Sequence, residues 1–124
     1  MQALLSATVM RVSECQSAGI DTAEMRVLIH QAKEALRAGN YAQAMNSFSA
    51  CDALARASRT LQRETYDAIS ETAGLVREAQ RGGVEVSGFL GALLQAKTAF
   101  SRSAFAEARE LADRVRADLE QLQP

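Results

Sequence analysis

Apolar residues recur at steps of three and four along most of the chain. In the segment 25–36, this spacing places Met25, Ile29 and Leu36 on one stripe of a helix with about 3.6 residues per turn. Repetition of the pattern predicts an all-α fold. The five expected helices cover residues 1–17, 22–38, 41–80, 87–102 and 104–122.

Residues that favour helix ends separate these segments. Asp21 is suited to the N-cap of the second helix, and Glu24 three residues later completes a box-like pair. Gly39 can adopt the left-handed conformation that ends this helix. Asn40 can then cap the next helix, with Gln43 at its third position. A turn this short predicts that the two helices are antiparallel.

The chain aligns with itself at an offset of 64 residues, which places Gly19 on Gly83. A period of that length corresponds to a supersecondary unit. Residues 1–60 and 65–124 are therefore expected to be two tandem copies of one three-helix unit within a single all-helical domain, 1–124. Identical residues at this offset include Gln31 and Gln95, Ala32 and Ala96, Lys33 and Lys97, and Ala35 and Ala99.

The expected helix over residues 41–80 is the longest of the five. It contains no proline and no glycine before Gly74, and it is rich in alanine, arginine, glutamate and leucine, which favour helix. Its middle, residues 55–65, carries few apolar side chains. We interpret it as the third helix of the first copy continuing as the first helix of the second, so that both copies share one long central helix.

Ala32, Gly39, Tyr41, Ala44 and Phe48 follow a spacing of small, turn, aromatic, small and aromatic positions. The spacing resembles the turn region of a tetratricopeptide repeat, and the last two helices of the three-helix MIT domains are similar. The resemblance covers about one hairpin per copy, and the 64-residue offset differs from the tetratricopeptide period of about 34 residues. It implies docking of a peptide or protein in a groove between helices. The second copy retains Ala96, Phe105 and Ala108 at matching positions.

Composition narrows the classes of partner. The chain has 124 residues and a formal net charge of -1, with charges of both signs interspersed, so no strong field for nucleic acid is expected. Long uncharged stretches, such as residues 40–51, are short of the roughly 20 apolar residues of a membrane helix. The first ten residues lack the basic start and the apolar length of a secretory signal. We therefore expect no membrane span and a cytoplasmic location.

The residues that most often hold metals are few. His30 is the only histidine, and no cysteine or acidic pair shows ligand spacing around it, so neither a metal nor a catalytic role is expected for it. Cys15 and Cys51 fall on Ala79 and Val115 at the 64-residue offset, which predicts buried thiols that pack as small apolar groups. A disulfide between them stays open, since it requires Cα atoms within about 7 Å. No cofactor is expected.

Three arginines form a first candidate for protein binding. Arg56, Arg59 and Arg63 lie at steps of three and four on one face of the long helix, where they could meet phosphates or an acidic partner. Glu64 and Asp67 follow at once, and aromatic residues are not interleaved. A solvated helix face is the alternative interpretation.

A second candidate lies in the fourth helix. Leu90 and Leu94 add an apolar edge beside the expected core stripe, and Gly91 between them removes a side chain that would hold a neighbouring backbone away. A helix that is apolar on nearly all sides is normally covered by other elements on two opposite faces. We hypothesise that Leu90, Gly91 and Leu94 bind a partner, a further repeat or a second copy. The first copy has Arg26, Val27 and His30 at these positions.

These features favour a non-enzymatic helical-repeat scaffold or protein-interaction module, either within a longer array or as a homo-oligomer. The competing hypothesis is a ligand-binding or sensory helical bundle. Such a pocket needs convergent polar groups, and the candidates are Thr8, Ser58, Gln62 and Thr72. An enzyme is not expected, because the chain shows no nucleophile and base pair, cofactor motif or metal spacing.

Overall fold

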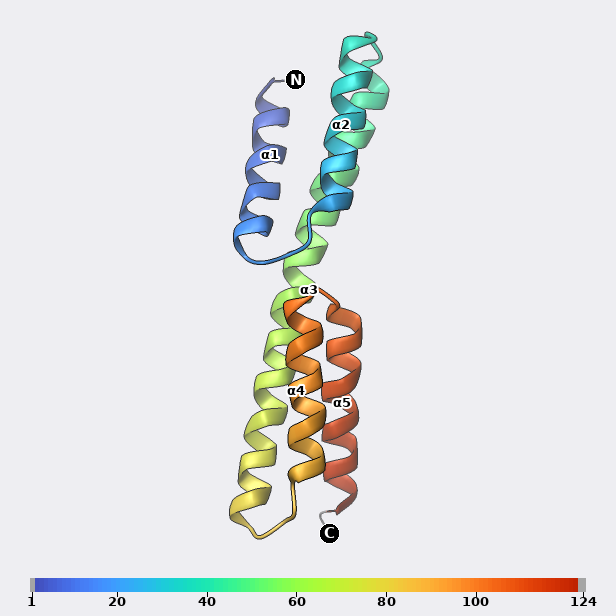
Figure 1. The fold of residues 1–124 in the computed structure, drawn as a ribbon. Helices are drawn as coiled ribbons and strands as arrows, with labels where there is room; N and C mark the ends of the chain where they lie inside the picture. The colour runs from blue at the N-terminus through green and yellow to red at the C-terminus, as the bar shows by residue number, and fades with distance from the viewer. Residues whose placement is uncertain (1, 123–124) are drawn as a thin grey trace. The chain divides into compact units, whose positions relative to one another are not determined.

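The structure, a computed structural model, describes residues 2–122, and within them the fold is all-α with five helices and no strand (Figure 1). The helix bounds agree with the expected ones to within one residue, and the expected start at Met1 lies outside the described residues. The helices are α1 (Gln2–Ser17), α2 (Ala23–Arg37), α3 (Tyr41–Arg81), α4 (Ser87–Ser101) and α5 (Phe105–Leu122).

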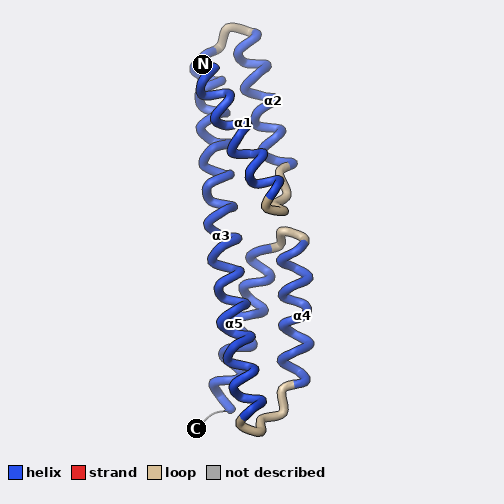
Figure 2. Tube along the Cα trace, turned by 90° about the vertical axis from the view of Figure 1, so that its left-hand side faces the viewer, coloured by secondary structure: helices blue, strands red, loops and turns tan. Residues whose placement is uncertain are grey.

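The chain divides into two compact units, Met1–Thr60 and Leu61–Pro124, and the boundary falls inside α3. The first unit contains α1, α2 and the beginning of α3. The second contains the remainder of α3 together with α4 and α5. Within each unit three helical segments lie side by side and are joined by short turns (Figure 2).

The start of α2 differs from the expectation. Thr22, not Asp21, is the N-cap, and its side chain makes no capping hydrogen bond. Thr22 is buried. The carboxylate of Asp21 still accepts a hydrogen bond from the Ala23 N–H, with an N···O distance of 3.0 Å.

The start of α3 follows the predicted chemistry. Asn40 Oδ1 accepts a hydrogen bond from the Gln43 N–H at 3.1 Å, and Asn40 Nδ2 donates to Gln43 Oε1 at 2.9 Å. The first bond satisfies a backbone N–H that has no partner within the helix. Gly39, just before it, has the predicted left-handed conformation, with φ of +77°.

The hydrogen bonds that close the turns of the first unit recur 64 residues later in the second. Each such bond connects the residue after the turn to a carbonyl in the last helical turn, the arrangement that ends a helix at a left-handed residue. The acidic residues before α2 and α4 also match. The Asp21 carboxylate accepts a hydrogen bond from the Ala23 N–H, and the Glu85 carboxylate accepts one from the Ser87 N–H at 3.1 Å. The matched N–H to O=C bonds are Ile20 to Cys15 and Val84 to Ala79, and Asn40 to Ala35 and Ala104 to Ala99.

One turn lacks the glycine of its counterpart. Gly19 and Gly83, 64 residues apart, both have positive φ, of +84° and +92°. At the other turn Gly39 corresponds to Ser103, which has φ of +63° and is the single non-glycine with positive φ in residues 2–122. A Cβ atom makes this conformation unfavourable by roughly 1 kcal/mol. The second unit therefore carries backbone strain that the first does not.

Buried positions also match at the same offset. Small residues occupy the interior where the two helices of each hairpin cross, so the backbones approach closely. Larger residues fill the remaining space in both units. Fully or largely buried pairs include Thr8 and Thr72, Val12 and Val76, Ala32 and Ala96, Ala44 and Ala108, and Cys51 and Val115.

The aromatic residues break this correspondence. Tyr41 and Phe105 were expected to share one role, but Tyr41 is 61% exposed and Phe105 only 5%. In the first unit the interior ring is Phe48, where the second unit has Ala112. The second unit instead packs the Phe105 ring edge-on against Phe100, with centroids 5.3 Å apart. Each unit fills its core with a ring from a different position, which leaves Tyr41 at the surface.

Candidate functional site

Two exposed leucines of the second unit lie one helical turn apart on α4. Leu90 is 46% exposed and Leu94 is 66% exposed, the highest value for a large apolar residue in the described chain. Gly91 between them is also exposed. We call Leu90, Gly91 and Leu94 the α4 leucine face. At its register the first unit has two polar residues, Arg26 and His30, around the exposed Val27.

Gly91 does not serve a close contact within the described chain. A Cβ atom built at this glycine would meet no other atom within 4 Å. The neighbouring backbone that the sequence led us to expect is therefore not supplied by residues 2–122. The surface above Gly91 is open.

A groove of about 360 Å³ runs between α3 and α4 of the second unit. Apolar and aromatic side chains form most of its lining, and the rings of Tyr66 and Phe100 lie with centroids 6.2 Å apart. We call this the α3/α4 groove. It is lined by Tyr66, Ile69, Ser70, Ala73 and Arg77 from α3, and by Lys97 and Phe100 from α4.

Two cations border this groove from opposite helices. Arg77 on α3 and Lys97 on α4 make no ion pair with any side chain that the structure describes. Some cations of this unit are paired, since Arg109 lies 3.2 Å from Glu64 and Arg116 lies 3.6 Å from Glu71, whereas the exposed Arg63 and Arg81 are in no ion pair with a described side chain. The α3/α4 groove thus combines an apolar lining with two positive charges that no described acid neutralises.

The α4 leucine face borders the same groove by helical register. Leu90, Leu94 and Lys97 follow one another on α4 at steps of four and three, which brings them to one side of the helix. Lys97 lines the groove, so the two leucines continue its α4 edge. The two leucines thus lie on the side of α4 that carries Lys97, beyond the lining of the groove.

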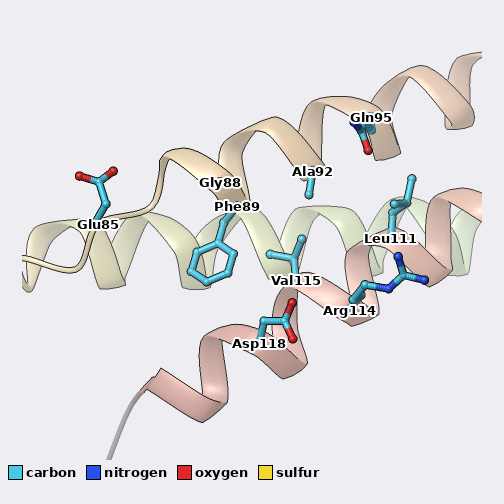
Figure 3. Close-up of a pocket in the computed structure, with 9 residues that line it drawn as sticks. All are labelled: Glu85, Gly88, Phe89, Ala92, Gln95, Leu111, Arg114, Val115 and Asp118. Carbon is cyan, nitrogen blue, oxygen red and sulfur yellow. The ribbon is translucent and has the colours of Figure 1, made fainter.

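A second groove, of about 350 Å³, lies between α4 and α5. Figure 3 shows Phe89 from α4 and Val115 from α5 pointing into the space between the helices. Two of its polar side chains, Glu85 and Arg114, already have partners close by. Glu85 accepts hydrogen bonds from the Ser87 hydroxyl at 2.6 Å and from its N–H, and these bonds lower the pKa of Glu85. Arg114 pairs with Glu110 at 3.1 Å.

The three arginines proposed from the long helix differ in their surroundings. Arg56 lies 2.9 Å from Asp52, which also pairs with Arg11 of α1. Arg59 lines a shallow surface groove of the first unit. Arg63 is exposed and belongs to the second unit. The boundary between the two units separates Arg63 from the other two.

Both cysteines are free thiols buried in the first unit, and the structure contains no disulfide between them. The Cys51 thiol donates to the Met25 carbonyl at 3.4 Å, and the Cys15 thiol lies 3.6 Å from the Ala55 carbonyl. Burial raises the pKa of each thiol. Raised pKa values and lack of access make both sulfurs poor nucleophiles.

The polar groups considered for an internal ligand pocket are divided between the two units. Thr8 and Ser58 belong to the first unit, and Gln62 and Thr72 belong to the second. The Thr72 hydroxyl has a long hydrogen bond of 3.5 Å to the Ala112 carbonyl, while the buried Thr8 hydroxyl has no hydrogen-bond partner in the described chain.

His30 is exposed on α2. No group of three or more His, Cys, Asp or Glu side chains within residues 2–122 is arranged to hold a metal ion. None of the helices in that range combines the length and the apolar character needed to cross a membrane.

The sequence patterns above do not single out Arg77 and Lys97. Neither has an acidic residue three or four positions away on either side, so no ion pair at that spacing is available within its own helix, but Lys33 of the first unit shares this feature. Their placement across one groove depends on α3 and α4 lying side by side. That placement requires the folded structure.

Comparisons with protein-family models, with curated proteins and with solved structures find no match for this chain.

Proposed function

We propose that the protein is a non-enzymatic helical-repeat module that holds or spaces other proteins, and that the α4 leucine face is its docking surface. The observation that carries this proposal is the exposure of Leu90 and Leu94, on either side of an open glycine surface. Exposed apolar patches bordered by polar residues mark interaction sites. The occupant is a partner protein, a further repeat of a longer array or a second copy. The resemblance to tetratricopeptide and MIT hairpins is in keeping with docking between helices.

We further propose that the two units are copies of one three-helix module and that α3 serves as the last helix of the first copy and the first helix of the second. The matched turn hydrogen bonds and the matched buried positions, 64 residues apart, support this interpretation. Apart from the aromatic positions of the two cores, divergence then includes the outward faces. The α4 leucine face is such a divergent surface, because the first unit has Arg26 and His30 in place of the two leucines.

The competing function is binding of a small molecule. It is favoured by the volume of the α3/α4 groove, about 360 Å³, which falls within the range of ligand pockets. The hairpin interiors weigh against it, since buried alanines bring the helices close together and leave little space between them. Ala96 and Ala108 are fully buried in the second unit.

The docking surface is tested by replacing both leucines with lysine. We expect Leu90→Lys with Leu94→Lys to raise the solubility of the protein, because the double substitution removes exposed apolar area. If the occupant is a second copy, the double variant should also have a lower mass in light scattering. Val27→Lys is the matched control, since Val27 is 54% exposed on α2 at the position equivalent to Gly91. The proposal would be contradicted if the original protein is monomeric at high concentration and the double lysine variant has the same solubility and the same mass as the original.

A further inference from the structure

We infer that the α3/α4 groove binds an acidic amphipathic helix of a partner protein. The inference rests on the proposed function, because it names the chemistry of the partner that docks beside the α4 leucine face. It is argued from the shape of the groove, its unneutralised charges and the absence of the same combination in the first unit.

The shape of the groove favours a helix as the occupant. Two adjacent helices present rows of side chains with a furrow between them, and a third helix packs into such a furrow. Tyr66 and Arg77 mark the extent of the lining along α3. Eleven residues separate them, which corresponds to about 16 Å or three turns of a docked helix. No strand within residues 2–122 offers an edge to an extended peptide.

The apolar lining defines one side of the occupant. Ile69 and Ala73 line the groove on α3 and Phe100 lines it on α4, while Leu90 and Leu94 extend the apolar area along the outer side of α4. A partner helix that covers this surface needs an apolar stripe with residues at steps of three and four.

The charges define the flanks of the occupant. Arg77 and Lys97 stand on opposite helices at the border of the groove, and neither has an ion-pair partner in the described chain. Carboxylates on both sides of the apolar stripe would meet these two cations. Such complementarity selects acidic partners and disfavours basic ones. The occupant is therefore acidic as well as amphipathic.

The first unit supplies a natural comparison. It keeps one cation of the pair, Lys33 in place of Lys97, but has Ser13 in place of Arg77. It also lacks both leucines at the matching positions of α2. The combination of an apolar border and paired cations therefore belongs to the second unit, and Lys33 is a matched control for Lys97.

The experiment selects helical peptides on the intact chain. A phage library of peptides of about 16 residues, built on a helical framework with randomised outer positions, is panned against the full-length protein. We expect the enriched peptides to carry Leu, Ile or Val at helical spacing, flanked by Asp or Glu. A synthetic copy of the most enriched peptide is then titrated by fluorescence anisotropy.

Charge reversal identifies the groove. Arg77→Glu with Lys97→Glu should weaken binding of the acidic peptide at least about tenfold, and a peptide with its acids replaced by lysine should recover binding to that variant. Lys33→Glu should leave the affinity unchanged. Circular dichroism of each variant verifies that the helical content is retained.

Four results would overturn the inference: no enriched peptide, enriched peptides without acidic residues, binding insensitive to the double reversal, or a groove that takes dodecanoate while no peptide binds. If the enriched peptides show no preference for acidic residues but their binding is weakened by Leu90→Lys and Leu94→Lys, this inference alone is refuted and the proposed function stands. Acidic peptides that depend on Arg77 and Lys97 but ignore both leucine changes would support the groove and remove the α4 leucine face from the proposed function.

Discussion

The first and second units close their turns with the same hydrogen bonds but expose different side chains on the matching helices α2 and α4. The shared bonds involve backbone groups, and the shared buried positions are held mostly by small residues. Both features fix how two helices meet. The exposed positions do not contribute to the packing of the two helices. At these positions α4 has Leu90 and Leu94, whereas α2 has Arg26 and His30. The difference teaches that the hairpin geometry does not depend on its outer surface.

The largest predicted effect tests the different aromatic cores. Phe48 is fully buried in the first unit, so Phe48→Ala leaves a cavity that neighbouring helices fill only in part. We expect it to lower the free energy of unfolding by about 3–5 kcal/mol. Urea denaturation followed by circular dichroism measures the change.

Tyr41→Ala is the matched aromatic control for that prediction. Because Tyr41 is largely exposed, its loss should cost less than about 0.5 kcal/mol. Equal losses for the two variants would mean that the ring of Tyr41 contributes to the core, as the pairing of Tyr41 with Phe105 in the sequence led us to expect.

A smaller effect compares the second turn of each unit. Ser103 holds a left-handed φ at the position where the first unit has Gly39. We expect Ser103→Gly to stabilise the protein by about 0.5–1 kcal/mol, because glycine adopts this conformation without a Cβ clash. Gly39→Ser should destabilise it by a similar amount. Thermal denaturation of both variants checks the pair, and a change of the same sign in both would refute the interpretation.

The smallest effect at neutral pH concerns the thiols. Burial raises the pKa of Cys15 and of Cys51 above their ordinary value of 9.0. Below that pH both the folded and unfolded chains keep these thiols protonated, so their contribution to stability is fully present. Above it the unfolded chain releases the protons first, so the free energy of unfolding falls as pH rises.

The residues of the second unit provide the matched variants for this test. Cys15→Ala and Cys51→Val copy Ala79 and Val115. Urea denaturation at pH 7 and pH 10 should show that the double variant loses less stability than the original chain at the higher pH. A difference between the two proteins that does not change with pH would contradict the prediction.

The helices were predictable because local signals determine them. Asn40 and Gly39 act through groups within a few residues, and both have their predicted roles in the structure. The N-cap of α2 lies one residue later than predicted, at Thr22, whose side chain makes no capping hydrogen bond that a sequence pattern could have signalled. The exposure of Tyr41 depends on which ring fills the interior, and Phe48 does so in the first unit.

The candidate site was predictable only in part. Leu90 and Leu94 stand outside the apolar stripe of α4, so periodicity alone suggested that they face outward. Arg77 and Lys97 are twenty positions apart, and no local pattern relates them. Their convergence on the α3/α4 groove follows from the packing of two helices, which determines the chemistry of the surface between them.

The alanines at the helix crossings have a consequence for how such a protein can change over time. Ala32 and Ala44 in one hairpin, and Ala96 and Ala108 in the other, have no exposed surface. A longer side chain at any of them would push the backbones apart, so these positions tolerate little variation. Mutations that alter affinity must therefore accumulate on the outside, where they leave folding intact. Such an architecture lets recognition evolve separately from stability.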